Sequence, residues 1–437
     1  MSVLQAYADM LKKGDSKTAK CEFVNNIKEV NEKINAYSHV VDVMEDACCS
    51  IPRKENMPEH LSRMWMMPVI VKDNIDVRGM PTTVGSEIFR HSSAASQDAS
   101  VIARLRASGA IFPGKGNMDE LAAHVSGTTS AFGPTINPCD ELVARSPGGS
   151  SSGIAAAVAA GIAWAGVGTD TGGSIRIPAA WCGLYGLRPT CGSICSHGVF
   201  PRAVSLDSVG LIAKKHEDID LLYRILARMH PGEAVSAHGR YRMRVFAHGQ
   251  YGDLISEEIR CNLDMFVESC RQAGHCIDDG QKESIFSQKI ADSSNRIRSF
   301  EFSRDAGPYI EGALKKNIDI HEIILNDYEN GLSIPYDAYM DALDYMYAMR
   351  NRLSDFFGDA DFIVAPVAPC TALPLDSQAD AFSAARMLMD FASLAGVPTF
   401  VIPYGKDARN LPIGIQLIGK PFSEPLLLDA CRDEMLP

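Results

Sequence analysis

Residues 146–178 read SPGGSSSGIAAAVAAGIAWAGVGTDTGGSIRIP, with two glycine–serine clusters on either side of an alanine-rich run. Gly148 and Gly149 permit backbone conformations that a side chain would forbid. The serines that follow them precede a predicted helix, whose free amide groups and positive end favour an anion. The second cluster, residues 171–174, follows a predicted strand, and its consecutive amides could converge on one oxygen atom. The stretch therefore predicts a helix and a strand that together hold a reactive oxygen.

The sequence around this stretch alternates between strand and helix patterns. Short apolar runs with β-branched residues predict strands at 66–71, 110–112 and 163–167. Helical patterns lie between them, at 98–109 with Asp98 as the N-cap, at 118–124 and at 154–160. Strands that alternate with helices in this way predict an α/β fold whose sheet is covered on both faces.

The rest of the chain has a different pattern of helices and strands from this central part. We expect N-terminal helices over residues 1–60, the core over 61–215, a mostly helical region over 216–360, and a return to the core sheet over 361–437. The predicted helices of the third part are 218–229, 256–272 and 336–357, and the strands of the last part are 362–366, 399–403 and 413–417. We interpret residues 1–437 as a single domain, with a separate middle domain as the alternative.

Composition restricts the possible partners of the chain. The 437 residues are 46% hydrophobic and 22% charged, the balance of a globular protein. A net charge of −12 disfavours direct binding of nucleic acid or of an anionic membrane. The longest apolar stretch is shorter than the ~20 residues of a membrane span, and no secretory signal is apparent. Twelve cysteines without a CxxC pair predict reduced thiols, no metal site and a cytoplasmic protein.

A serine nucleophile needs a base, and no histidine lies near either cluster. Lys72 ends the apolar run of the first predicted strand and precedes Asp73. Burial would disfavour the charged form of this lysine and lower its pKa toward that of a usable base. The alternative is a lysine that leaves the strand for solvent or pairs with Asp73.

Other nucleophiles and other sites remain open on the residues alone. Residues 149–153 also fit the GxSxG elbow, which would make Ser151 the nucleophile, but that motif requires a strand before it and 140–147 is a poor one. Cys182 could pair with Lys72, although its surroundings are typical of core. The glycines at 166–172 do not have the spacing of a dinucleotide-binding loop.

Further motifs run through nearly the whole chain in one order. They are VKDN at 71–74, NMDE at 117–120, FG at 132–133 with NP at 137–138, the two clusters, CG at 182–183 with GLRPT at 186–190, LAGVP at 394–398 and LPIGIQLIG at 411–419. With these motifs the chain resembles the amidase signature family. The resemblance implies a three-layer α/β/α fold with a central twisted mixed sheet covered by helices. It also implies hydrolysis of a carboxylic amide, with no cofactor.

The resemblance assigns roles to individual residues. The family's catalytic lysine falls on Lys72, its bridging serine on Ser150, reached by a cis peptide, and its nucleophile on Ser174. Lys72 would take a proton from Ser174 through Ser150, so that Ser174 can attack the amide carbonyl. Water would then hydrolyse the acyl-enzyme that results. The resemblance further implies an oxyanion hole and a set of supporting residues; these are the main-chain amides of Thr171, Gly172, Gly173 and Ser174, the side chains of Ser151 and Asp170, and Arg176 in a structural role.

The chain departs from the family at several positions. Ser152 replaces a usual glycine and adds a hydroxyl near the relay, and Gly116 replaces a threonine. In the glutaminase components of the family's amidotransferases, an arginine and an aspartate are expected to hold glutamine; Arg350 matches the arginine, but Arg386 takes the place of the aspartate. A cation there cannot pair with an ammonium group. We therefore hypothesise that Arg350 or Arg386 meets an acidic or neutral substrate, with surface or helix-face pairing of both as the alternative.

Two kinds of enzyme fit these observations. The first is a free-standing amidohydrolase that releases ammonia or an amine from a small-molecule amide, alone or as a homodimer. The second is the glutaminase component of a tRNA-dependent amidotransferase, which would need a partner subunit that binds tRNA. A non-catalytic binding protein on an amidase scaffold is a weaker alternative, because all three relay positions are intact.

Overall fold

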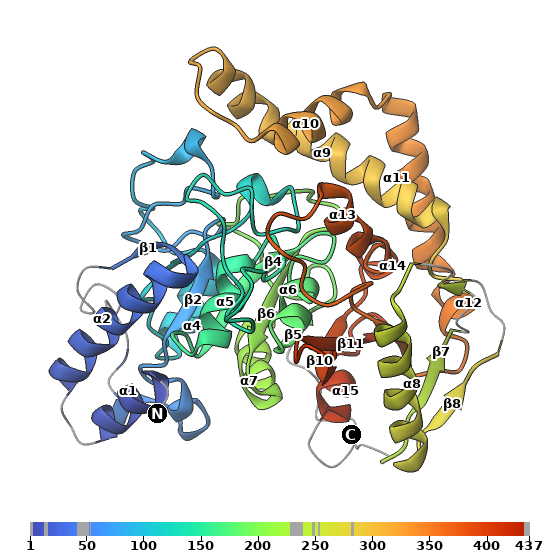
Figure 1. Cartoon of the computed structure of the whole chain (residues 1–437), viewed down its shortest axis with the longest axis horizontal. Helices are drawn as coiled ribbons and strands as arrows, with labels where there is room; N and C mark the ends of the chain where they lie inside the picture. The colour runs from blue at the N-terminus through green and yellow to red at the C-terminus, as the bar shows by residue number, and fades with distance from the viewer. Residues whose placement is uncertain are drawn as a thin grey trace.

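The computed structural model describes residues 3–12, 16–41, 52, 54–227, 239–246, 250–251, 254–280 and 284–431. Within these ranges a single 11-stranded sheet runs in the order β1-β3-β2-β4-β6-β5-β10-β11-β9-β7-β8 (Figure 1). The strands are β1 (Tyr37–Val40), β2 (Val69–Lys72), β3 (Gly114–Gly116), β4 (Ala165–Asp170), β5 (Tyr185–Arg188), β6 (Ser208–Ala213), β7 (Arg242–Val245), β8 (Cys276–Asp278), β9 (Phe362–Pro366), β10 (Thr399–Lys406) and β11 (Pro412–Gly419).

The sheet is mixed. β2 pairs in parallel with β3 and β4, whereas β4 pairs antiparallel with β6, and β10 antiparallel with β5 and β11. The helices are α1 (Val3–Lys12), α2 (Ser16–Ile34), α4 (Ser100–Ala107), α5 (Ser152–Ala160), α6 (Arg176–Trp181), α7 (His216–Leu226), α8 (Glu257–Gln272), α9 (Gln288–Leu314), α10 (Glu322–Ser333), α11 (Tyr336–Asn351), α12 (Leu353–Phe357), α13 (Ala379–Met387), α14 (Asp390–Ala395) and α15 (Glu424–Ala430).

Both faces of the sheet are covered by helices. Gly186 of β5 faces Ala179 of α6, while its neighbour Tyr185 packs against His216 of α7. Because successive strand residues point to opposite faces, α6 and α7 lie on opposite sides of the sheet. In the same way Gly414 of β11 faces α6 and Gly419 faces α15. The predicted fold class, a mixed α/β sheet flanked by helices, is confirmed.

Close contact between α5 and the sheet depends on small residues. A Cβ added to Gly166 of β4 would overlap the Ile154 side chain of α5, and one added to Gly116 of β3 would lie 3.2 Å from the same side chain. The alanines at 155–157 of α5 are fully buried. The helix that carries the first serine cluster is thereby seated directly on β2, β3 and β4.

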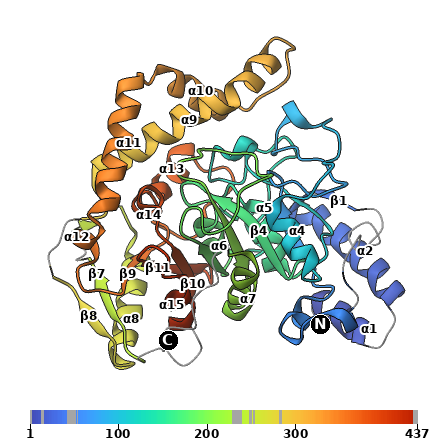
Figure 2. The same ribbon diagram turned by 180° about the vertical axis from the view of Figure 1, so that it is seen from behind.

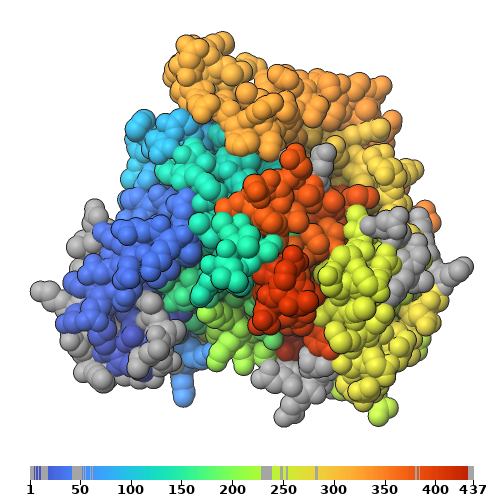
Figure 3. Space-filling model, viewed as in Figure 1, coloured from blue at the N-terminus to red at the C-terminus, as the bar shows by residue number. Residues whose placement is uncertain are grey.

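Helices α9, α10 and α11 form a separate layer at one edge of the molecule (Figures 1 and 2). α10 and α11 both pack on α9, and α9 also contacts α14. In the space-filling view this orange layer lies directly on the loops drawn in light blue and teal (Figure 3). A small hydrophobic cluster joins the two, and it includes Val84, Met118, Leu121, Phe302, Ile310 and Ile324.

Several local predictions were wrong. Residues 110–112 contribute only an isolated bridge from Ile111 to Pro68, and the strand of this region is β3, which begins at Gly114. The predicted helix 118–124 is a single 3-10 turn over Glu120–Ala122, because Leu121 and Ala122 have φ near +51° and +56°. Asp98 does not cap α4; its carboxylate accepts from the Arg78 amide and pairs with Arg106 instead.

The middle region is mostly helical, as predicted, but it also supplies two strands. β7 and β8 extend the sheet beyond β9 through parallel pairing. α7 ends at Leu226, and the last two residues of the predicted helix 218–229 lie outside the described residues. None of the described helices is long and apolar enough to cross a membrane. The ten cysteines among the described residues are all free.

Candidate active site

Lys72 lies at the end of β2 and is fully buried. Its Nζ is 2.7 Å from Ser150 Oγ, 2.9 Å from Thr169 Oγ1 and 3.3 Å from the Thr169 main-chain oxygen. Burial lowers the pKa of Lys72 to about 7, against the attraction of carboxylates that include Asp170. Near neutral pH a large fraction of this amine is therefore uncharged and able to accept a proton.

Asp73 does not pair with Lys72, so the alternative interpretation of that lysine was wrong. The Asp73 carboxylate forms an ion pair with Lys115, at 3.1 Å, and both side chains are buried. It also accepts hydrogen bonds from the hydroxyls of Ser38 and Thr83. Lys115 lies on β3 beside Val71 of β2, and sequence reasoning missed it because its partner is 42 positions earlier. Because Lys115 pairs with the Asp73 carboxylate, the Lys72 amine is free to form its hydrogen bond with Ser150.

Ser150 lies between the lysine and the second serine. Its Oγ is 3.1 Å from Ser174 Oγ, and the Gly149–Ser150 peptide bond is cis, as the resemblance implied. Gly149 has no room for a side chain, since an added Cβ would overlap the Asp119 carboxylate. That carboxylate accepts from the main-chain amides of Gly127, Thr128 and Thr129, at 2.9, 3.1 and 3.2 Å. Asp119 thus holds a second loop against the one that carries Ser150.

Ser174 lies in the turn between β4 and α6 and is 4% exposed. Of the four amides predicted to hold an oxyanion, that of Gly173 donates to Asp170 Oδ1 at 3.0 Å. The amides of Thr171, Gly172 and Ser174 have no acceptor among the described residues. The turn therefore presents three free N–H groups beside the Ser174 hydroxyl.

Asp170 anchors this turn. Its carboxylate pairs with Arg176 at 2.9 Å and with Arg188 at 3.1 Å, and it also accepts from the Ile175 amide. Burial alone would raise the pKa of Asp170, but the two guanidinium groups hold it well below its usual range. Arg176 also donates to the main-chain oxygen of Met389, which ties the turn to the segment before α14. Arg188 lies in a quoted motif, but its contact with Asp170 was not predicted.

The two rival nucleophiles are placed differently. The Ser151 hydroxyl is 3.4 Å from the Thr169 main-chain oxygen, and no contact with Lys72 is present among the described residues. No strand precedes Ser151 directly in the described segment 117–151, so the elbow motif lacks the geometry it requires. The Cys182 thiol points to the Pro147 carbonyl, and burial raises its pKa well above the ordinary value. A thiol held in the protonated form is a poor nucleophile.

The departures from the family pattern are accommodated away from the relay. The Ser152 hydroxyl donates to the main-chain oxygen of Asn117 at 3.3 Å and lies 3.4 Å from Thr135 Oγ1. It therefore fastens the start of α5 to the neighbouring loop. Gly116 faces Ile70 and Ile154 so closely that a side chain would crowd both.

Arg350 and Arg386 lie in different surroundings. Arg350 donates to the main-chain oxygens of Leu394 and Ser205, at 2.9 and 3.3 Å. Arg386 donates to the main-chain oxygen of Ala123 at 2.7 Å. No ion pair of either arginine with another described residue is present, and the hypothesis that one of them meets the substrate stays a prediction.

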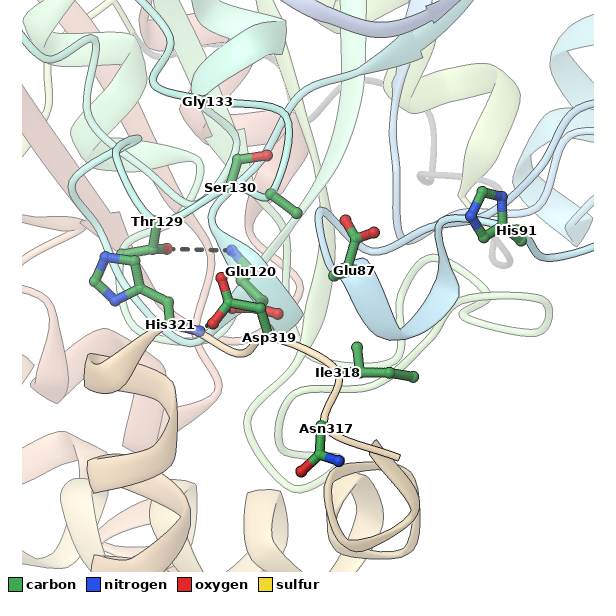
Figure 4. A pocket seen from close by; sticks show the side chains of 11 residues that line it. Glu87, His91, Glu120, Thr129, Ser130, Gly133, Asn317, Ile318, Asp319 and His321 are labelled. Carbon is green, nitrogen blue, oxygen red and sulfur yellow. Dashed lines mark hydrogen bonds between the residues drawn. The ribbon is translucent and has the colours of Figure 1, made fainter. Parts of the chain in front are cut away.

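A cavity of about 690 Å³ lies between the loop before α10 and the loop after η4 (Glu120–Ala122) (Figure 4). It is lined by Glu87, Glu120, Thr129, Ser130 and His321, among others, and by none of the three relay residues. The Glu120 carboxylate already accepts from the Ser86 hydroxyl and the His321 amide. No group of three or more potential metal ligands occurs among the described residues.

The class of protein to which this mixed sheet and its buried Lys72, Ser150 and Ser174 belong is shown by comparison with known proteins, and it is the amidohydrolases. A family model described as Amidase matches residues 21–428, and the chain belongs to this amidase signature family.

Curated relatives and solved structures agree with this assignment. The A subunit of glutamyl-tRNA(Gln) amidotransferase from Koribacter versatilis (strain Ellin345) is 31% identical over 443 residues, which is 93% of this chain and 92% of that protein. A structure described as an amidase is 27% identical, with a TM-score of 0.82 and 98% of both chains covered. The corresponding amidotransferase chain of Thermotoga maritima is 25% identical, with a TM-score of 0.79 and coverage of 100% of this chain and 97% of that one.

Proposed function

We propose that this chain hydrolyses a carboxylic amide through Ser174 as nucleophile, Ser150 as proton bridge and Lys72 as base. The observation that carries the proposal is the continuous path from Nζ to Oγ to Oγ, at 2.7 and 3.1 Å, inside a buried site. The lowered pKa of Lys72 supports the same assignment, because only a neutral amine can take up a proton.

In the first half-reaction, the Ser174 oxygen attacks the amide carbonyl carbon and passes its proton to Ser150, which passes its own to Lys72. The carbonyl oxygen becomes an oxyanion that the amides of Thr171, Gly172 and Ser174 stabilise. The C–N bond then breaks, the relay returns the proton to the nitrogen, and ammonia or an amine leaves. In the second half-reaction, water attacks the acyl-enzyme by the same relay and releases the carboxylic acid.

The proposal is tested by mapping the adduct of a serine-directed fluorophosphonate by peptide mass spectrometry. We expect the label on Ser174, no label in Ser174→Ala, and a loss of several orders of magnitude in amide turnover in Ser174→Ala and Lys72→Ala with folding retained. A label on Ser151 or Cys182, or full activity of Lys72→Ala, would exclude the relay.

A second candidate is the glutaminase component of an amidotransferase, because curated relatives named as such amidotransferase chains match more than 90% of this one. That function predicts negligible activity alone and co-purification with a partner that binds tRNA, whereas a free-standing amidase predicts turnover of simple amides by the isolated chain. Glutaminase turnover that survives Arg386→Ala but is lost in Arg350→Ala would favour this second candidate. It would overturn the hypothesis that free glutamine is not used.

We further propose that residues 1–437 act as one amidase domain. Support comes from the sheet, to which both the first described strand and the last contribute.

A further inference from the structure

Asn74 lies two residues after Lys72, and its side chain is buried. Its Nδ2 atom donates to the Phe200 main-chain oxygen at 3.1 Å and to Thr169 Oγ1 at 3.2 Å. Because a carbonyl oxygen can only accept, the contact with Phe200 determines which end of the Asn74 amide is the nitrogen. The Asn74 nitrogen therefore donates to the Thr169 hydroxyl oxygen and cannot accept a hydrogen bond from it.

The orientation of the Asn74 amide is fixed by its neighbours. The Phe200 main-chain amide donates to the Asn74 main-chain oxygen at 2.8 Å, so the two residues are joined by two hydrogen bonds. The Asn74 Oδ1 atom is buried and has no partner among the described residues. The hydrogen bonds of this amide within the described part of the chain are therefore all made by its nitrogen end.

The Thr169 hydroxyl lies between Asn74 and Lys72. Lys72 Nζ has three oxygen neighbours, which are Ser150 Oγ at 2.7 Å, Thr169 Oγ1 at 2.9 Å and the Thr169 main-chain oxygen at 3.3 Å. Among the described residues, the lone pair of a neutral Lys72 is the one acceptor available to the Thr169 hydroxyl hydrogen. Donors and acceptors therefore match when Asn74 donates to Thr169 and Thr169 donates to an uncharged amine.

The hydrogen bond from Asn74 also weakens Thr169 as a partner for a charged lysine. An oxygen that already accepts from an amide N–H is a poorer acceptor for an ammonium group, and the positive end of the amide dipole points toward that oxygen. A hydrogen bond donated to the neutral form of a base disfavours its charged form. Both effects favour the neutral Lys72 amine, as its burial does.

The charged groups around Lys72 act in the opposite direction or are paired with each other. Three carboxylates attract its charged form; they are those of Asp170, Asp119 and Asp207. Of these, Asp170 is itself paired with Arg176 and Arg188. Asp73 and Lys115, from β2 and β3, form a buried ion pair, and α5, which packs on β2, has no charged residue. Uncharged contacts must therefore contribute to the neutral state of the amine.

We propose that Asn74 is a positioning residue that directs the Thr169 hydroxyl toward Lys72 as a donor and so keeps this amine neutral and able to accept a proton. This role rests on the proposed function, in which Lys72 is the base. During the reaction, rotation about the Cε–Nζ bond turns the lone pair to Ser150, which passes on the proton of Ser174. The ammonium group that results has three N–H groups for its three oxygen neighbours.

A titration of Lys72 by NMR tests the proposal without turnover. Full-length Ser174→Ala protein is labelled with carbon-13 at the lysine ε carbons, and the Lys72 signal is the one lost when Lys72→Ala is added. We expect Asn74→Ala to raise the pH of half-protonation by about 0.5 to 1 unit, and Asn74→Asp to raise it further, because a carboxylate attracts the ammonium form. In the intact enzyme, kcat/KM of Asn74→Ala at about pH 6 should fall about 3- to 10-fold relative to its own plateau.

Further variants separate this role from a structural one. Thr169→Val keeps the shape of the side chain but removes the hydroxyl, so Asn74→Ala should no longer move the Lys72 titration in this background. Asn137→Ala is the matched control, because Asn137 is also buried and donates to two main-chain oxygens. It should lower stability and leave the Lys72 titration unchanged. Asn330→Asp, at an exposed position of α10, controls for the added negative charge.

An unchanged or lowered titration of Lys72 in the Asn74 variants, or a shift that persists in Thr169→Val, would overturn the proposal. Asn74→Leu keeps the volume and is read in the same way if Asn74→Ala does not fold. An unchanged titration together with an inactive Lys72→Ala enzyme would remove this role of Asn74 alone. A shifted titration together with full activity of Lys72→Ala would remove the proposed function alone.

Discussion

Lys72 is the residue whose ionisation sets the pH range of the proposed reaction. Only its neutral form accepts a proton, and its pKa is lowered to about 7. We expect kcat/KM to fall about tenfold for each pH unit below about pH 7 and to level off above it. A pH–rate profile with a neutral amide checks this expectation. Activity that stays constant down to pH 5 would show that Lys72 is not the base.

At the same scale, the sequence predicted the residues of the proposed relay better than it predicted the buried ion pairs that position them. Lys72, Ser150 and Ser174 were predicted, and the structure brings them into contact. The pairing of Lys115 with Asp73 and of Arg188 with Asp170 was not predicted. In each pair the two residues lie on, or directly after, two different strands of the sheet. No local sequence pattern indicates which buried charges will meet across the sheet.

At the scale of elements, the β4–α6 turn depends on one carboxylate. Asp170→Asn would leave Arg176 and Arg188 buried without their anion, and we expect the free energy of unfolding to fall by about 3–5 kcal/mol. Urea unfolding followed by circular dichroism measures the change. Asp220→Asn is the matched control, because its ion pair with Arg224 is partly exposed and should contribute less than about 1 kcal/mol. Equal effects of the two substitutions would contradict the assigned role of Asp170.

The same carboxylate has a pH signature. Its pKa in the folded protein lies well below the unfolded value, so its contribution to stability is present above about pH 4 and is lost as the pH falls further. The wild-type protein should therefore lose more stability on acidification than Asp170→Asn does.

The loop that carries Ser150 depends on the absence of a side chain at Gly149. We expect Gly149→Ala to lower stability by about 1–3 kcal/mol and to reduce turnover, because the new methyl group would overlap the Asp119 carboxylate. Thermal unfolding and the initial rate measure the two effects. Gly312→Ala is the control, since nothing lies within 4 Å of a methyl group there and alanine favours the helix. A Gly149→Ala protein with normal rate and stability would contradict the close approach.

Elements with a strong apolar period were predicted well, and elements with a special backbone were not. The helices α5 and α8 appear where their patterns indicated, whereas the predicted helix 336–357 is divided at Arg352 into α11 and α12. The segment 118–124 has helix-forming residues, but Leu121 and Ala122 adopt positive φ while Asp119 gathers the amides of the following loop. β7, with its alternating arginines, lacks the apolar run that marked the other strands. Tertiary hydrogen bonds decided both cases.

At the scale of the whole molecule, the sheet order could not be predicted, because it depends on pairings across the full length of the chain. β5 lies between β6 and β10, and β10 comes more than 200 residues after β5 in the sequence. Helical patterns in the middle region masked the two strands that complete the sheet at its far edge.

A continuous sheet of this kind has a thermodynamic consequence. If the chain is one domain, as proposed, we expect a single unfolding transition whose calorimetric and van't Hoff enthalpies agree. Differential scanning calorimetry measures both quantities. Two resolved transitions would indicate that the helical middle region unfolds independently.

The residues of the proposed relay come from β2, from the start of α5 and from the turn after β4, all within the first 174 positions, whereas the layer of α9, α10 and α11 comes from positions 288–351. If the relay acts as proposed, bond cleavage and this layer are encoded in separate stretches of the gene. A mutagenesis library confined to codons 288–351 should therefore leave the relay intact, and a screen of amide turnover should find more active variants in it than in a library of equal size over codons 70–175.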